Sequence, residues 1–112
     1  MDAPGALERF LDRNPGLSLV ARSSGGIVGA VLCGHDGRRG YLHHLAVASA
    51  ERGRGIGRRL AEEAIRRLSL QGIAKCHLFV RIDNSDAAAF WTRLGWEKRE
   101  DIEMYSLEAP NE

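Results

Sequence analysis

The first half of the chain consists of short apolar runs separated by turn residues, a pattern that predicts strands. Residues 17–21 alternate apolar and polar side chains, and residues 27–33 form a continuous apolar run typical of a buried strand. Residues 41–47 follow a glycine-containing turn and form a third expected strand. The connections between these strands are short, so we expect an antiparallel meander. A short helix over residues 5–13 precedes them.

The second half of the chain has the periodicity of helices. One face of the first predicted helix is a continuous apolar stripe, made by positions 56, 60, 61, 64, 65 and 68. A strand is predicted over residues 77–82, a second helix over residues 85–94 (starting at 85 or 86) and a last strand over residues 102–107. The succession of strand, helix and strand around residues 45–82 implies one parallel pair inside a mixed sheet.

Composition narrows the class of protein and its partners. With 44% hydrophobic and 28% charged residues, the chain suits a single globular α/β domain over residues 1–112. The net charge of +1 argues against nucleic acid as a partner. We expect a cytoplasmic protein without membrane association, because no apolar run reaches transmembrane length and no signal peptide is recognised. Cys33 and Cys76 lie in apolar runs and lack metal-ligand spacing, which predicts buried thiols and no metal site.

A segment rich in glycine and arginine at the start of the first long helix is the strongest chemical signal. Gly53, Gly55 and Gly57 alternate there and let backbone N–H groups approach a ligand closely. Those groups lie at the positive end of a helix dipole, where anions bind. Residues 52–59 carry four arginines and no acidic residue, so a phosphate group is the expected ligand. A glycine-rich turn with solvated arginines is the alternative.

The spacing of the glycines distinguishes among phosphate-binding motifs. A P-loop needs Lys-Ser or Lys-Thr after its last glycine, whereas Gly57 is followed by two arginines. A dinucleotide fingerprint that begins at Gly53 or Gly55 lacks its third glycine. The pattern Arg52-x-x-Gly55-x-Gly57 instead resembles the pyrophosphate-binding Q/R-x-x-G-x-G/A segment of the GNAT family of N-acetyltransferases.

The same resemblance is supported by a second motif, Asn84-x-x-Ala87-x-x-Phe90-Trp91-x-x-x-Gly95-Trp96. It is similar to the N-x-x-A-x-x-F-Y-x-x-x-G-F signature of that family and follows the first motif at the right distance. The resemblance covers about residues 17–107. It implies a strongly twisted mixed sheet that splays open between the strands at 41–47 and 77–82. It also implies that acetyl-CoA lies in this opening, with its pyrophosphate on residues 52–58.

The resemblance assigns roles in the acetyl-CoA site. The backbone of Leu45, Ala46 and Val47 is expected to pair with the pantetheine arm like an added strand. An N–H near Val47 is expected to polarise the thioester carbonyl. Asn84 is expected to hydrogen-bond the cofactor arm, with a helix N-cap as its alternative role. Further cofactor contacts are expected from the two motifs: Arg52, Gly53, Arg54, Gly55, Ile56, Gly57, Arg58, Phe90 and Trp91.

Acetyl transfer to an amine requires the neutral amine, and two histidines are candidates for its base. An alkylamine has a pKa of roughly 10.4, so a proton acceptor assists the reaction at neutral pH. His43 is predicted to share a strand face with Tyr41, Leu45 and Val47, whereas His44 faces the other side. We favour His43 and keep His44 as the alternative, since a β-bulge would change the facing. A surface histidine without a catalytic role is the third possibility.

Trp91 is the clearest departure from the family pattern. In the family, a tyrosine at this position usually protonates the leaving thiolate, whereas the indole N–H of Trp91 is not an acid of useful strength. Solvent, Tyr41 or Tyr105 could replace it. Trp91 could instead pack in the core, which its helical spacing favours.

We therefore predict an N-acetyltransferase that carries acetyl from acetyl-CoA to a primary amine of a small molecule or peptide by direct attack. A non-catalytic acyl-CoA-binding or regulatory module is the alternative, favoured by Trp91 and by the short segment before residue 17, where the family usually has a further strand and helix. An exposed first strand favours a homodimer. A nucleic-acid-binding role for the arginine cluster is disfavoured because the overall charge is not basic.

Overall fold

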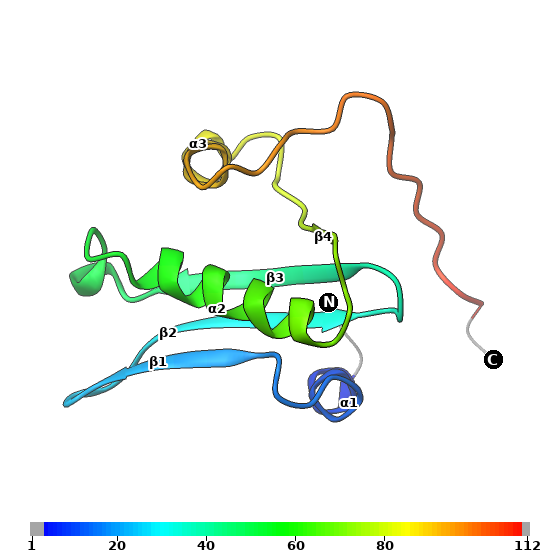
Figure 1. Ribbon diagram of the computed structural model, residues 1–112. Coiled ribbons are helices and arrows are strands. Elements are labelled where there is room, and N and C mark those ends of the chain that lie inside the picture. Colours follow the sequence, from blue (N-terminus) through cyan, green and yellow to red (C-terminus); the bar gives the residue numbers. More distant parts are fainter. Residues whose placement is uncertain (1–3, 111–112) are drawn as a thin grey trace. The chain divides into compact units, whose positions relative to one another are not determined.

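The computed structural model describes residues 4–110, which divide into a first compact unit ending at Phe79 and a second beginning at Val80. The first unit contains a four-stranded sheet of order β1-β2-β3-β4 (Figure 1). Its elements are α1 (Ala6–Arg13), β1 (Leu19–Ser23), β2 (Gly26–His35), β3 (Gly40–Val47), the 3₁₀ turn η1 (Ser49–Glu51), α2 (Ile56–Leu70) and β4 (Cys76–His77). The second unit contains α3 (Ser85–Arg93).

The sheet confirms the predicted mixed topology. β1 pairs with β2 and β2 pairs with β3 in antiparallel fashion, and β4 pairs with β3 in parallel after α2. The strand predicted over 77–82 was wrong in extent, because only Cys76 and His77 pair with β3. The strand predicted over 102–107 was wrong, because that segment has no ladder partner among the described residues. Alternating side chains alone do not make a strand, whose backbone groups need a partner.

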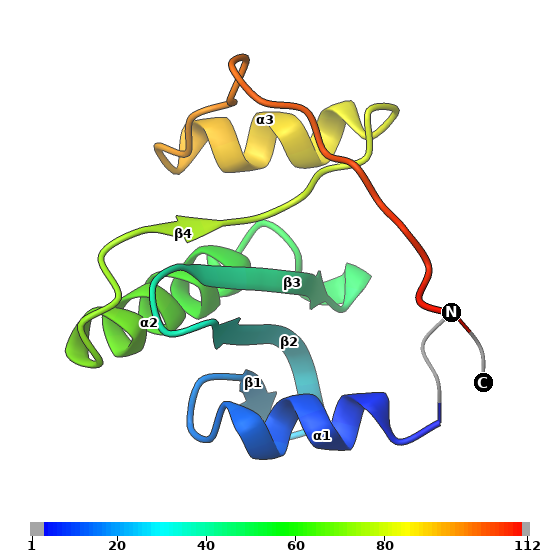
Figure 2. The same ribbon diagram turned by 90° about the vertical axis from the view of Figure 1, so that its right-hand side faces the viewer.

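The sheet of the first unit separates two faces, each contacted by one helix. A Cβ added at Gly40 would lie 2.6 Å from Leu68 Cδ1, so one face packs against α2. A Cβ added at Gly34 would lie 2.9 Å from Phe10 Cζ, so the other face meets α1. We call these the α2 face and the α1 face. Figure 2 shows α1 beside β1 and β2, and Figure 1 shows α2 running along the sheet.

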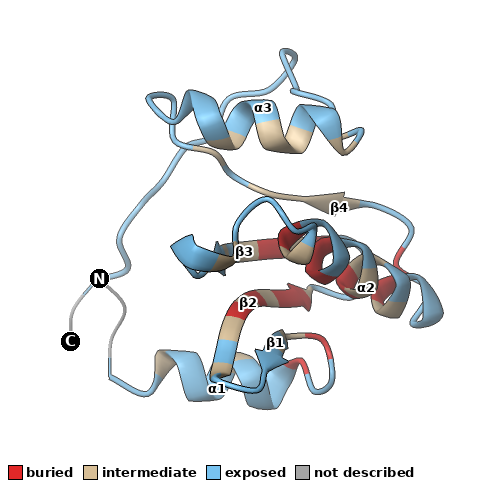
Figure 3. Ribbon diagram, turned by 90° about the vertical axis from the view of Figure 1, so that its left-hand side faces the viewer, coloured by how far each residue is buried: buried red, intermediate tan, exposed pale blue. Residues whose placement is uncertain are grey.

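The core lies between the sheet and α2 (Figure 3). It consists of apolar residues from the sheet, from α2 and from the segments before β1 and after α2: Leu17, Val31, Cys33, Leu42, Leu60, Ala61, Ala64, Leu68 and Ile73. The stripe predicted for α2 is therefore the face that packs, and burying each large apolar side chain contributes about 1.5–3 kcal/mol. α1 buries none of its residues completely. The α1 face of the sheet is consequently the more accessible of the two.

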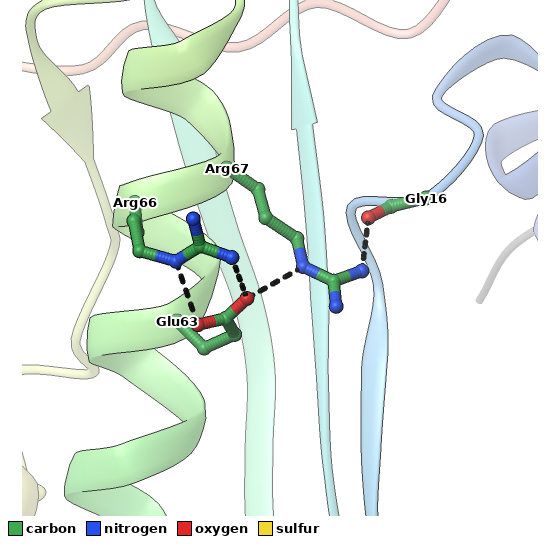
Figure 4. Close-up of polar contacts among 4 residues, drawn as sticks. All are labelled: Gly16, Glu63, Arg66 and Arg67. Atoms are coloured by element: carbon green, nitrogen blue, oxygen red, sulfur yellow. Dashed lines mark hydrogen bonds and ion pairs between the residues drawn. The ribbon is translucent and has the colours of Figure 1, made fainter.

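An ion-pair cluster joins α2 to the segment before β1 (Figure 4). Glu63 Oε2 accepts hydrogen bonds from Arg66 Nη2 at 2.7 Å and from Arg67 Nε at 2.8 Å. Arg67 Nη1 also donates to the carbonyl of Gly16 at 2.9 Å. The bonds from Arg66 and then Arg67 lower the pKa of Glu63 to about 2. Their stabilising effect is thus present above the ordinary pKa of a glutamate and is lost as the pH falls towards 2.

Replacement of Gly40 by alanine is expected to lower the free energy of unfolding by about 1–3 kcal/mol, because the added Cβ overpacks the buried Leu68. Gly25→Ala is the matched control: its Cβ would meet nothing nearer than Ser23 Oγ at 3.9 Å, and its φ is not positive. Urea unfolding followed by circular dichroism measures both. Equal unfolding midpoints for the two variants would contradict the close approach of α2 to β3.

Candidate functional site

The last part of β3 has an edge without a neighbouring strand. β4 pairs with β3 only at Gly40 and Tyr41, so within the described chain no strand covers this edge beyond Tyr41. The hydrogen bonds of an antiparallel ladder alternate between the two edges of a strand. Because the N–H of Ala48 donates to the carbonyl of Val28 at 2.8 Å, the N–H and C=O of Val47 point to the uncovered edge. This edge presents backbone groups to a ligand.

A β-bulge lies close to that edge. Ala30 of β2 pairs with Ala46, whereas Leu32 pairs with His43, so β3 takes three steps where β2 takes two. His44 has a φ of 52°, in the left-handed region that residues other than glycine rarely adopt. As a result, His43 and Ala46 lie on the same face of the sheet, although an unbroken strand would place them on opposite faces.

The bulge also corrects the predicted facing of His43. Val47 pairs with Gly29, whose added Cβ would lie 3.2 Å from Ile56 Cγ2, so the Val47 side chain is on the α2 face. His43 shares the α1 face with Tyr41. The prediction that His43 shares a face with Val47 was wrong, because one inserted residue reverses every side chain beyond it. The backbone of Val47 still points to the uncovered edge.

His43 is half-buried among rings on the α1 face. The ring centroid of Phe10 lies 5.8 Å away in an edge-on arrangement, and the ring of Tyr41 stacks at 6.2 Å. The ring of the neighbouring His44 lies 6.4 Å away. Burial, and then the charge of His44, lowers the pKa of His43 below its ordinary value. The neutral imidazole that this favours at neutral pH is a proton acceptor.

The loop before α2 contains the glycines of the first motif. Gly53 and Gly55 have φ angles of 83° and 80°, and a Cβ added at either position would meet nothing within 4 Å. Glycine is therefore favoured there by backbone conformation, and open space surrounds the loop. Gly55 is the N-cap of α2 and no side chain caps the helix. The N–H groups of the first turn of α2 are thus left for water or an anion.

The arginines around this loop differ in their partners. Arg52 Nε donates to the carbonyl of Val47 at 3.2 Å, which ties the loop to the uncovered edge of β3. Arg54 and Arg58 form exposed ion pairs with neighbouring glutamates, at 3.2 Å and 3.0 Å. The local positive charge is accordingly smaller than four arginines imply. Within residues 4–110, Arg52 forms no ion pair.

The start of α2 is packed against the sheet beside Val47. A Cβ added at Gly29, the partner of Val47 in the ladder, would lie 3.1 Å from Leu60 Cδ1 and 3.2 Å from Ile56 Cγ2. Gly57, in the first turn of α2, is buried. These close contacts hold the uncapped N-terminus of the helix next to the uncovered edge of β3.

A shallow apolar hollow of about 320 Å³ lies at the end of β2 and β3, lined by residues 27–30 and 46–48. Its lining includes Ala30 and Ala46, which lie on the α1 face, as well as Gly29 and Val47, whose side-chain positions lie on the α2 face. Part of the hollow therefore lies on the α1 face. Along the α1 face, the next pair of residues after Leu32 and His43 is Ala30 and Ala46, which line the hollow. The hollow therefore lies beside His43. Sequence reasoning missed this hollow, because its position beside His43 depends on the bulge.

The second unit contains the residues of the second motif. Asn84 caps α3, with its Oδ1 accepting a hydrogen bond from the N–H of Ala87 at 3.0 Å, which is the alternative role considered for it. Trp91 packs edge-on against Phe90 and Trp96, with ring centroids 5.0 Å and 5.2 Å away. The ring of Trp91 therefore has packing partners inside its own unit.

The thiols do not provide a nucleophile. Cys33 is buried as predicted, whereas Cys76 is only half-buried. Burial raises the pKa of Cys33 to about 11 and that of Cys76 to about 12, so neither is a thiolate at neutral pH.

Among residues 4–110, no three His, Cys, Asp or Glu side chains are grouped to hold a metal. No helix in this described part is long and apolar enough to cross a membrane.

Comparisons with known proteins agree with the motifs. The model of the acetyltransferase (GNAT) family matches residues 2–96. An acetyltransferase of Pectobacterium atrosepticum is 41% identical over 91 residues, which are 81% of this chain and 64% of that protein. Ard1 from Thermoplasma volcanium has a similar fold, with a TM-score of 0.75 and 21% identity over 84% of this chain and 64% of Ard1.

A second solved structure with a similar fold is a chain of the NatC complex bound to a Gag peptide and CoA. Its TM-score is 0.75 at 24% identity, covering 89% of this chain and 69% of that one. The present chain thus spans about 64% of the length of its Pectobacterium relative and of Ard1.

Proposed function

The chain belongs to the acetyltransferase (GNAT) family, and from this premise we propose that it transfers an acetyl group from acetyl-CoA to a primary amine of a small molecule or peptide. The amine attacks directly, without a covalent enzyme intermediate. The observation that carries the proposal is the uncovered edge of β3, where the N–H of Val47 points outward beside the uncapped start of α2.

The residues of the first unit fit an acyl-CoA. The open space around Gly53 and Gly55 and the free N–H groups of the first turn of α2 suit a pyrophosphate. The charge of Arg52 complements it. The uncovered edge at residues 45–47 suits the amides of an extended pantetheine arm, which would add to the sheet like a strand. When bound, acetyl-CoA supplies the acetyl thioester.

The second unit contributes proposed contacts as well. Asn84 uses its Oδ1 in the cap of α3, so we assign its Nδ2 group to the cofactor arm. Phe90 and Trp91 remain proposed cofactor contacts through their ring faces. β1 lies at the edge of the sheet, which leaves its outer backbone groups available to a second copy of the chain, and a homodimer is part of the proposal.

The chemistry divides among three groups on β3. His43 takes the proton from the arriving ammonium, which frees the nitrogen lone pair. The amine nitrogen bonds to the acetyl carbon, the carbon–sulfur bond breaks, and the N–H of Val47 stabilises the negative charge on the carbonyl oxygen. A thiol has a pKa of roughly 8.5, so the thiolate leaves without a strong acid. Tyr41, which stacks on His43, is our candidate to protonate it. The nitrogen loses its second proton as the amide forms, and that proton passes through solvent to restore Tyr41. The proton held by His43 is released to solvent.

A coupled assay of the purified chain tests this function. CoA release from acetyl-CoA is followed with a panel of primary amines, and the acetylated amine is identified by mass spectrometry. The proposal predicts amine-dependent release of CoA in equal amount to product. Saturable binding of acetyl-CoA without any acetylated amine would instead favour a non-catalytic acyl-CoA-binding or regulatory module.

A further inference from the structure

The α1 face of β3 carries a row of rings that extends beyond His43. Tyr41 stacks on His43 with an interplanar angle of 11°, and Phe79 stacks on Tyr41 with centroids 6.4 Å apart and an angle of 17°. Tyr41 is half-buried and Phe79 is 62% exposed. Exposed ring faces attract cations as well as apolar groups, and the ammonium form of an amine is a cation. We call these three side chains the ring row.

The apolar hollow lies on the other side of His43 from Tyr41. Its walls at Ala30, Ala46 and Ala48 are small side chains, so the space above them is open. A volume of about 320 Å³ is at the lower end of the range for small-molecule sites. The hollow therefore suits a compact ligand body. The bulge places Ala46 on the same face as His43, which brings the imidazole beside the hollow.

No acidic side chain belongs to this surface among the described residues of the first unit that form it. Neither the ring row nor the lining of the hollow includes an aspartate or glutamate. The acidic residues of α1, Glu8 and Asp12, each lie two positions from Phe10, about 200° around a helix, and so on the side away from the ring row. A polycationic acceptor needs carboxylates to replace the water around its charges. The described residues of this surface offer apolar walls, aromatic faces and an imidazole.

We propose that the acceptor is a small monoamine with an apolar or aromatic body, bound with that body in the hollow and its amino group at His43 and Tyr41. The inference rests on the proposed acetyl transfer and names the class of its substrate. It excludes polyamines and aminoglycosides as preferred acceptors. The body contributes apolar contact, and the ring row receives the ammonium before it is deprotonated.

The proposal is tested by comparing the kinetics of two amines and by a variant whose larger side chain fills the hollow. For the purified chain, kcat/KM for phenethylamine is expected to exceed that for spermidine by about tenfold or more. Ala30→Leu, which fills the hollow, is expected to lower kcat/KM for phenethylamine by about tenfold without changing the KM for acetyl-CoA. Ala74→Leu is the matched control, because Ala74 is exposed and outside the hollow. Phe79→Ala, at an exposed position, is expected to raise the KM for phenethylamine.

Binding measured without turnover separates this inference from the proposed function. Saturation-transfer NMR of phenethylamine with the CoA-loaded chain is expected to show binding that Ala30→Leu weakens and Ala74→Leu keeps. That result without acetylation of any amine would overturn the acetyl transfer and leave the ligand class standing. A preference for spermidine, or no binding of phenethylamine, would overturn the ligand class even if acetyl transfer is observed.

Discussion

Gly55→Val is expected to raise the dissociation constant for CoA by about tenfold to a hundredfold. Gly55 has a φ of 80°, and a side chain in the left-handed region costs roughly 1–2 kcal/mol, more for a β-branched residue. The loop is expected to relieve this strain by leaving the left-handed region, which moves the N–H groups at the start of α2. Because each 1.4 kcal/mol corresponds to about tenfold in affinity, a calorimetric titration with CoA can measure the expected change in the dissociation constant.

Gly72→Val is the matched control for this variant. Gly72 follows the other end of α2 with a φ of 83°, and a Cβ there would also meet nothing within 4 Å. It therefore introduces the same backbone strain away from the loop. We expect it to lower the melting temperature much as Gly55→Val does and to keep the affinity for CoA. Equal loss of affinity in both variants would show that helix strain alone weakens binding, and the phosphate site would be misassigned.

His43→Ala is expected to lower kcat by about a hundredfold or more at neutral pH, the range for loss of a general base. The loss should be largest at the acid end and shrink as the pH rises towards the amine pKa of roughly 10.4, because free amine then forms without a base. The KM for acetyl-CoA should not change. Rates measured from pH 5 to pH 10 give the profile. A variant whose pH profile matches that of the unmodified chain would remove His43 as the base.

His44→Ala separates the two histidines. Burial and the charge of His44 lower the pKa of His43, so the unmodified chain should lose activity only as the pH falls below the ordinary pKa of a histidine. Removing His44 removes the repulsion and raises the pKa of His43, which moves the acid limb of kcat/KM to higher pH. The maximal rate should remain. A large loss of maximal rate in His44→Ala, with little effect of His43→Ala, would make His44 the base.

Local patterns in the sequence were sufficient for most of the fold. The stripe from Ile56 to Leu68 predicted the helix that packs on the sheet, because burial of an apolar stripe depends only on periodicity. The glycine loop was also predicted from a local pattern, the spacing of its glycines. In the structure, Gly53 and Gly55 adopt the positive φ that favours glycine. The cap at Asn84, which was considered only as the alternative to a cofactor contact, also depends on residues within one turn.

The order and direction of strand pairing were predicted, but its register and extent could not be. Nothing in the residues around His44 marks the bulge, which is visible only from the register of β3 against β2. The facing of His43 and the hollow at Ala30 and Ala46 follow from that register. The segment 102–107 alternates like a strand, but its state depends on a partner that the alternation does not reveal.

Calorimetric titration of the purified chain with acetyl-CoA, CoA and NAD, run in parallel, tests the central claim most directly. The edge of β3 and the loop at Gly53 and Gly55 predict saturable binding of both CoA species with one site per chain, and no saturable binding of NAD. Absence of heat with both CoA species, or equal binding of NAD, would contradict the assignment of this edge and loop to an acyl-CoA.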